Sequence, residues 1–395
     1  MDSKRLEELK VLYNTYCKDN AKNFLQTGKS FQDIVNMIND PNVDEHARSA
    51  LAEQFFTDEF VWGFIFADLS KMDLSNVPVD HLMRIPFSSQ TKWPTKDKLP
   101  KGFDPELLIQ NAKDYKDNNL ELLHRDNIDG RGIKVAYIDS PFNLVHQAFQ
   151  GKKIEYNGLS SDPECCHFHG YAVADRVLSV APNVDLVYYG CGDDNNIGEG
   201  GETVNKIRAL KKILARIKDG EDIVAVGMST SLEEAIDQIK DNDIRERSKK
   251  ELEKLRNSFG ELGVEIIDSP NAMSKFNYAY KLDPIKPNTD IDNFVPHRHA
   301  QSDILPHIIE ADKVRPLEYT VDDYVYENNL GSASWMIPQV VGLYCLAKQI
   351  NYDITFDEFA DICRDTASKP NEHGVKLTNP NEIIKEIEYR VENNY

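Results

Sequence analysis

The chain has 395 residues, of which 41% are hydrophobic and 28% are charged, and its formal net charge at pH 7 is -20. This length and apolar content are typical of a globular protein with two or three domains, or with one large α/β unit and an extension. The acidic balance argues against nucleic acid and anionic membrane surfaces as partners, because both are negatively charged.

The cysteines and the first residues indicate where the protein is found. None of the six cysteines belongs to a C-x-x-C pair, and Cys345 lies in an apolar run, where a free thiol acts as a small hydrophobic group. The opening MDSKRLEELK begins an amphipathic pattern and lacks the apolar run of a signal peptide. The apolar stretch 60–66 is far too short to span a bilayer. We therefore expect a cytoplasmic protein in a reducing compartment, with no membrane partner.

The first 85 residues have apolar side chains at helical spacing in three segments, which begin near residues 6, 31 and 45. The pattern stops over 86–105, where prolines and lysines are typical of a linker or an extended crossing segment. We therefore predict a helical N-terminal extension over 1–100, ending in a Pro-rich linker, and a second domain over 101–395.

Strands and helices alternate after a predicted helix at 106–115. The first strand, 132–139, is a near-continuous apolar run that ends on Asp139, which is typical of a parallel strand covered on both faces. This alternation predicts parallel βαβ units in one mostly parallel twisted sheet. In such a sheet, we expect the polar residues of a site at the carboxyl ends of the strands. The elements predicted later are helix 170–179, strand 184–189, helix 204–218, strand 223–228, helix 243–259, strand 264–267 and a buried helix within 331–347.

Three polar residues begin or end these elements. Asp139 ends a strand, His169 opens a helix, and Ser334 opens the buried helix, where its hydroxyl lies near backbone N–H groups and the positive end of the helix dipole. Taken singly, each is better explained as a turn or capping residue. Taken together they favour catalysis, because a serine hydroxyl needs a nearby base to act as a nucleophile at neutral pH.

Six segments resemble, in order along the chain, the motifs of the subtilisin-like serine proteases. GIKVAYIDS is similar to the aspartate motif, HGYAVAD to the histidine motif, and SASWMIPQVVG to the serine motif, which aligns the nucleophile with Ser334. VAVGMSTS resembles the strand that walls the primary specificity pocket, GVEIIDSPN the strand that ends on the oxyanion-hole asparagine, and RDTASK the closing segment of the core. The resemblance covers residues 122–369.

The resemblance implies a three-layer α/β fold and a serine endopeptidase that cleaves a specific protein or peptide. The triad would be Asp139, His169 and Ser334, and Asn271 would donate its side-chain N–H to the developing oxyanion. The residues expected to contact the substrate are Gly200, Gly201, Met228, Ser229 and Thr230.

Other interpretations stay open. The departures from the family motifs cluster around the predicted site, and the bulky Trp335 follows the serine, so the alternative is a catalytically inactive relative that acts as a binding or regulatory module. An esterase is a weaker possibility, because the chain has no G-x-S-x-G motif. Asp268 could attract a basic substrate residue, and the N-terminal helices could bind the protease domain or a regulator.

Two segments have partial metal-site patterns. His297, His299 and His307 lie in an irregular segment without a cysteine pair, which favours a surface loop over a zinc site. The acidic loop 193–202 has Ile197 where a calcium loop needs an oxygen ligand. We expect no metal and no cofactor.

Overall fold

The computed structural model describes residues 36, 39–42, 64–65, 67–83, 85–113, 120–159, 167–192, 201–283, 286, 289–297, 304–309, 314–317, 320–326 and 333–393. The chain divides into two compact units, which are taken separately here: Met1–Asp114 with Val145–Gln147 and Asp312–Leu330, and Tyr115–Leu144 with Ala148–Ala311 and Gly331–Tyr395. The three helices predicted before residue 69 lie almost entirely outside the described residues.

The first unit contains a small antiparallel sheet in the order β1-β11-β10. Its elements are α4 (Val79–Leu82), β1 (Phe87–Ser88), η2 (Lys96–Lys98), α5 (Pro105–Lys113), β10 (Val314–Pro316) and β11 (Tyr324–Tyr326).

The stretch 86–105, where we predicted a linker, is packed within this unit. Phe87 is fully buried and stacks on Tyr326, with ring centroids 4.9 Å apart, and it meets the ring of Trp93 edge-on. Trp93 also meets Phe103 edge-on at 5.1 Å. The first compact unit therefore includes residues on both sides of the predicted boundary near residue 100, and that domain boundary stays a prediction.

The second unit is built on a five-stranded sheet in the order β3-β4-β2-β5-β6, in which every pair of neighbours is parallel. The elements of its first part are α6 (Leu120–Arg125), β2 (Lys134–Asp139), β3 (Ile154–Gly158), α7 (Phe168–Val180), β4 (Asp185–Gly190), α8 (Gly201–Lys218), β5 (Ala225–Gly227), α9 (Leu232–Asp237), α10 (Asn242–Glu261) and β6 (Glu265–Ile267). The elements that follow are α11 (Ser269–Lys275), β7 (Asn277–Lys281), η4 (Ile291–Asn293), β8 (Phe294–Pro296), β9 (His307–Ile309), α12 (Ala333–Ile350), α13 (Phe356–Asp365) and α14 (Pro380–Asn393). One further 3-10 helix, η3, spans Gln147–Phe149.

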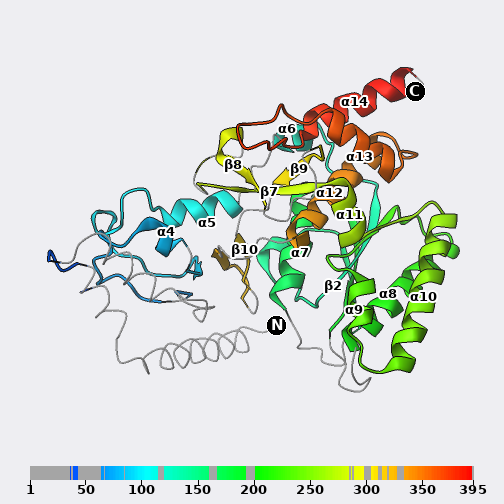
Figure 1. Ribbon diagram of the computed structural model, residues 1–395, viewed down its shortest axis with the longest axis horizontal. Coiled ribbons are helices and arrows are strands. Elements are labelled where there is room, and N and C mark those ends of the chain that lie inside the picture. Colours follow the sequence, from blue (N-terminus) through cyan, green and yellow to red (C-terminus); the bar gives the residue numbers. More distant parts are fainter. Residues whose placement is uncertain are drawn as a thin grey trace. The chain divides into compact units, whose positions relative to one another are not determined.

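Helices cover both faces of this sheet, which confirms the predicted α/β class with a parallel sheet and gives three layers. Ala136 and Ile138 of β2 belong to a buried cluster with side chains of α8 and α10. The intervening Tyr137 faces the other way, and its ring lies with Val341 of α12 over Gly227 of β5. Figure 1 shows α8 and α10 on one side of β2 and α7 and α12 on the other.

The predicted strands and helices of the sheet are confirmed to within a few residues, but several other elements, β3 and α11 among them, were not predicted. β3 has a half-exposed sequence, IEYNG, at the edge of the sheet, so it lacks the apolar run of its neighbours. α11 begins directly after β6 because the Asp268 side chain caps it and Pro270 fits its first turn.

Candidate active site

Asp139, His169 and Ser334 lie near the middle of the sheet, where the strand order reverses. From β2 the chain continues to β3 on one side of the sheet, and from β5 it continues to β6 on the opposite side. The strands β2 and β5 are neighbours, so the reversal falls between them. Open α/β sheets bind ligands outside the carboxyl ends of the strands at such a switch point. Asp139 ends β2, and Ser229 follows β5 by two residues.

Asp139 and His169 form a hydrogen bond at this position. His169 Nδ1 lies 2.5 Å from Asp139 Oδ1, and the carboxylate also accepts the Ser140 N–H at 2.7 Å. Asp139 is 3% exposed, whereas the His169 side chain is 21% exposed. The aspartate is therefore inside the protein, and the imidazole reaches the surface of the site.

Gly170 allows this close approach. A Cβ atom at Gly170 would lie 2.2 Å from the Ser140 carbonyl oxygen and 3.0 Å from that of Pro141, both of which are backbone atoms. His167 is the N-cap of α7, and its side chain accepts the His169 N–H. The motif therefore requires a glycine after the histidine for a steric reason, because α7 begins in close contact with the residues that follow β2.

The two groups shift each other's pKa in opposite directions. Burial disfavours the His169 imidazolium, but the charge and hydrogen bond of Asp139 outweigh it and raise the pKa of His169 above its ordinary value of 6.5. Burial also disfavours the Asp139 carboxylate, yet the charge and hydrogen bond of His169 bring the pKa of Asp139 below 3.8. Lys206 of α8 is buried and pairs with Glu202 at 2.7 Å. Its positive charge also lowers the pKa of Asp139.

Ser334 lies in the first turn of α12, and two reciprocal hydrogen bonds tie it to Ser229. The Ser229 hydroxyl donates to the Ser334 carbonyl at 3.0 Å, and the Ser334 hydroxyl donates to the Ser229 carbonyl at 3.4 Å. Pro338 explains the first bond, because proline has no N–H to give the carbonyl four residues earlier in the helix. Tyr137 completes this chain, with its hydroxyl 2.6 Å from Ser229 Oγ.

Trp335 packs against the imidazole of His169. The two ring centroids are 5.1 Å apart, the planes are tilted by 32°, and Trp335 is 6% exposed. The residue that follows Ser334 therefore contacts His169 directly, so the first turns of α7 and α12 meet at the carboxyl end of β2. The sequence alone provided no explanation for a bulky residue at this position.

Asn271, the predicted oxyanion donor, lies in α11. Its side-chain Nδ2 donates to the Glu265 carboxylate and, at 3.0 Å, to the Ile266 carbonyl. These two bonds use both N–H groups of the amide. The role of Asn271 toward a substrate stays a prediction, and in this arrangement its amide binds β6.

Asp268 does not attract substrate in this structure, which corrects that expectation. Its side chain is fully buried, accepts the Asn271 N–H as the cap of α11, and pairs with Arg256 of α10. Arg256 also pairs with Glu233 of α9. The charge of a buried carboxylate that pairs with an arginine is already neutralised, so it does not attract an incoming basic residue.

The predicted substrate-contacting residues differ in their accessibility. Ser229 and Thr230 follow β5, and the Thr230 carbonyl accepts the Ser269 N–H at 3.4 Å. The Met228 side chain is buried in the cluster with α8 and α10. Gly201 is the buried first residue of α8, and Gly200 lies outside the described residues. Their roles in substrate binding stay predictions.

The histidines with near-metal spacing have other neighbours where they are described. His297 stacks on Tyr278 with ring centroids 4.4 Å apart, and His307 lies in β9, while His299 is outside the described residues. In the part of the chain that the structure describes, no group of three or more His, Cys, Asp or Glu side chains is arranged to hold a metal ion. The expectation that no metal and no cofactor are needed is not tested.

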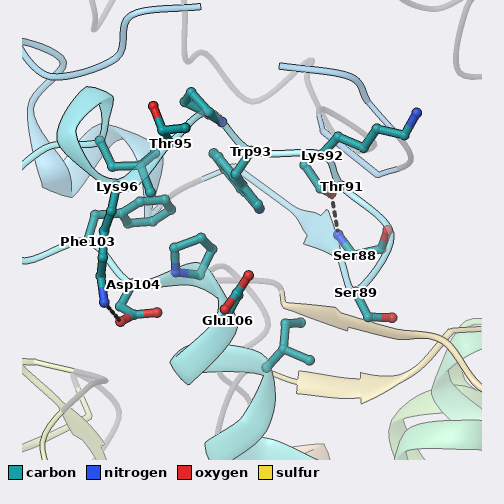
Figure 2. A pocket seen from close by; sticks show the side chains of 14 residues that line it. Ser88, Ser89, Thr91, Lys92, Trp93, Thr95, Lys96, Phe103, Asp104 and Glu106 are labelled. Carbon is teal, nitrogen blue, oxygen red and sulfur yellow. Dashed lines mark hydrogen bonds and ion pairs between the residues drawn. The ribbon is translucent and has the colours of Figure 1, made fainter. Parts of the chain in front are cut away.

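A pocket of about 620 Å³ lies in the first unit and includes none of the predicted catalytic residues among those that line it. Figure 2 shows Trp93 and Phe103 on its wall, with Glu106 projecting from α5. Lys96 pairs with Asp104 at its rim at 3.3 Å. The predicted active site is therefore defined by its hydrogen bonds at the sheet and not by this pocket.

Three residues of the site were not singled out from the sequence: Tyr137, Lys206 and Gly170. Tyr137 looked like one more apolar residue of a buried strand, and Lys206 like one of the many charges of an amphipathic helix. Gly170 was used only as part of a motif. A polar hydroxyl in a run that is otherwise apolar was the available signal for Tyr137.

No protein-family model matches the sequence, and no curated protein is significantly similar to it. The chain is similar in structure to subtilisin-like proteases. One is the prenylagaramide maturation protease PagA, with 14% identity, a TM-score of 0.43, and coverage of 68% of this chain and 98% of that one. A chain from the subtilase cytotoxin SubAB assembly has 12% identity, a TM-score of 0.47, and coverage of 72% and 97%. A cold adapted subtilisin-like serine proteinase has 15% identity, a TM-score of 0.37, and coverage of 64% and 89%.

Within the described residues we find no helix with the length and apolar content that a bilayer crossing requires.

Proposed function

We propose that this chain is a serine endopeptidase of the subtilisin type, which hydrolyses peptide bonds of a specific protein or peptide through Asp139, His169 and Ser334. The observation that supports this most is the hydrogen bond of His169 to Asp139 at the switch point of the sheet, with the residue after Ser334 packed on the same imidazole. A partly exposed base held by a buried carboxylate is what a serine nucleophile needs.

The hydrogen bond determines which nitrogen of His169 acts. Because Nδ1–H donates to Asp139, the lone pair of Nε2 can accept the Ser334 hydroxyl proton once that hydroxyl turns away from the Ser229 carbonyl. As that proton leaves, Oγ bonds to the substrate carbonyl carbon and the carbonyl electron pair moves to oxygen. When the C=O bond reforms, the C–N bond breaks and the leaving amine takes the proton from Nε2. Water then repeats both steps and releases the acyl group, while Asp139 stays ionised and stabilises the imidazolium.

Asn271 is proposed as an oxyanion donor, and this role requires its amide to release Glu265 or the Ile266 carbonyl when substrate binds. Those two bonds are also the observation that favours the alternative function, an inactive relative that acts as a binding or regulatory module. An amide fixed to β6 has no N–H to offer a developing negative charge. The two functions therefore differ in whether peptide bonds are broken.

The cellular setting is part of the proposal. Cys191, Cys345 and Cys363 are buried free thiols among the described cysteines, which supports a reducing, cytoplasmic location. The net charge of -20 supports a peptide or protein substrate over nucleic acid. The N-terminal residues are proposed to bind the protease domain or a regulator.

The test is cleavage of a proteome-derived peptide library, read by mass spectrometry of the new N-termini. Wild type is compared with Ser334→Ala and with Ser75→Ala, a control at an exposed serine of the first unit. We expect the same cleavage set from wild type and Ser75→Ala and none from Ser334→Ala. Equal, background-level cleavage by all three proteins would reject the protease and favour the inactive relative.

A further inference from the structure

Trp335 is the residue whose place in the site the protease function does not explain. It follows the proposed nucleophile in α12, it is 6% exposed, and its ring packs on His169 with centroids 5.1 Å apart and a 32° tilt. Its backbone carbonyl also accepts the Gln339 side-chain amide at 3.0 Å. The backbone of Trp335 thus belongs to the first turns of α12, while its ring contacts a residue of α7.

Asp139 alone does not fix the orientation of the imidazole. The hydrogen bond to Nδ1 holds one point of the ring, and the ring plane can still pivot about that contact. A second contact on the face of the ring removes this freedom and so determines where Nε2 points. Small errors in the placement of a catalytic group cost large factors in rate, so such a contact has a function.

We propose that Trp335 is a positioning residue that holds the imidazole plane of His169 and stabilises its charged form, an inference that rests on the proposed function. The electron-rich face of an indole attracts a cation, and His169 becomes one when it takes the serine proton. Because Trp335 directly follows Ser334, one turn of α12 carries both the proposed nucleophile and the ring that contacts His169.

Other charged groups also act on His169, and the test has to hold them constant. Asp139 on β2 and Glu202 on α8 favour the imidazolium, whereas Lys206 on α8 disfavours it. Burial by Trp335 itself also disfavours it. Trp335→Leu is therefore the right variant, since leucine keeps an apolar cover and removes the aromatic face, whereas Trp335→Phe keeps both.

The experiment is a pH titration of the His169 side chain by NMR in the full-length protein, with the resonance assigned by His169→Gln, beside the rate of labelling by a fluorophosphonate. In Trp335→Leu we expect the acid dissociation constant of His169 to rise about two- to fivefold and the labelling rate to fall roughly tenfold. Trp335→Phe should stay close to wild type in both. Trp93→Phe, a tryptophan of the aromatic cluster in the first unit, is the control and should change neither.

Each outcome has a definite meaning. Loss of thermal stability in Trp335→Leu, with the titration of His169 unchanged, would show that the indole only fills space and would overturn the inference. Unchanged titration and labelling would do the same. If wild type is not labelled at Ser334 but the titration moves as expected in Trp335→Leu, the proposed protease fails while the positioning role of Trp335 stands.

Discussion

Asp139 and Asp268 both follow buried strands of the same parallel sheet, yet their carboxylates have opposite uses. Asp139 ends β2 and pairs with His169, whose side chain is 21% exposed, so its charge is directed toward the surface of the site. Asp268 follows β6, caps α11 and pairs with Arg256, which also pairs with Glu233. One aspartate holds an imidazole, and the other holds two helices together.

The difference comes from what each aspartate meets in the fold. Gly170 lets the start of α7 approach the end of β2, which brings an imidazole to Asp139. No such approach occurs at Asp268, where the chain turns at once into a helix and α10 supplies a guanidinium. A carboxylate at the end of a strand is thus a candidate for a site, and its partner decides whether it is one. The predictions below test this contrast.

Asp139→Asn should have the largest effect, and that effect should be on reactivity. An amide at this position favours the wrong tautomer of the histidine, and in serine proteases the corresponding change lowers turnover by roughly ten to the fourth power. We expect a loss of about three to four orders of magnitude in the rate of fluorophosphonate labelling, with a thermal midpoint close to wild type. A labelling rate within tenfold of wild type would mean that Asp139 does not support the base.

Asp268→Asn should show the reverse pattern. The variant removes the charged partner of Arg256 at Asp268 but leaves Glu233 beside it, so the loss should be about 2 kcal/mol, the value of a hydrogen bond between charged groups. Urea unfolding should report a loss of that order, while the folded fraction keeps its labelling rate. Strong loss of labelling at full stability would instead assign Asp268 to the active site.

Gly170→Ala should come next, because the added methyl group meets backbone that cannot move aside. Overpacking of this kind costs about 1 to 3 kcal/mol, and it should also lengthen the contact between His169 and Asp139. Gly260→Ala is the matched control, since a Cβ there meets nothing within 4 Å and alanine favours its helix. Equal stability of the two variants would contradict the steric role given to Gly170.

The sequence predicted the parts of this site that depend on local pattern. The apolar runs of β2 and α12 and the spacing of α7 placed Asp139, His169 and Ser334 at the ends of the right elements. It did not predict that Asp268 meets Arg256 or that Trp335 meets His169, because both contacts depend on how separate elements pack and not on the local pattern of residues. It also did not predict the use of the Asn271 amide, because the helix α11 that carries it depends on the Asp268 cap.

The smallest predicted effect concerns the Ser334 carbonyl, which accepts from Ser229 because Pro338 has no N–H. Ser229→Ala removes the donor to this carbonyl and also the partner of the buried Tyr137 hydroxyl, so it should cost about 2 kcal/mol. In a Pro338→Ala background, the helix can supply the missing N–H, so the cost of Ser229→Ala should fall by about 1 kcal/mol, the net value of one hydrogen bond. Urea unfolding of the four proteins in this double-mutant cycle measures the difference. Equal costs in both backgrounds would show that the proline and the serine act independently.

The central claim is that His169, held by Asp139, serves as the base for Ser334, and the most direct measurement is fluorophosphonate labelling as a function of pH. The labelled residue is identified by peptide mass spectrometry. Because the neutral imidazole is the active form and Asp139 raises the pKa of His169 above 6.5, labelling should be slow at acid pH and rise with a midpoint above that value. The label should be found on Ser334 and disappear in Ser334→Ala. Labelling at another residue, or none at any pH in a folded protein, would contradict the account.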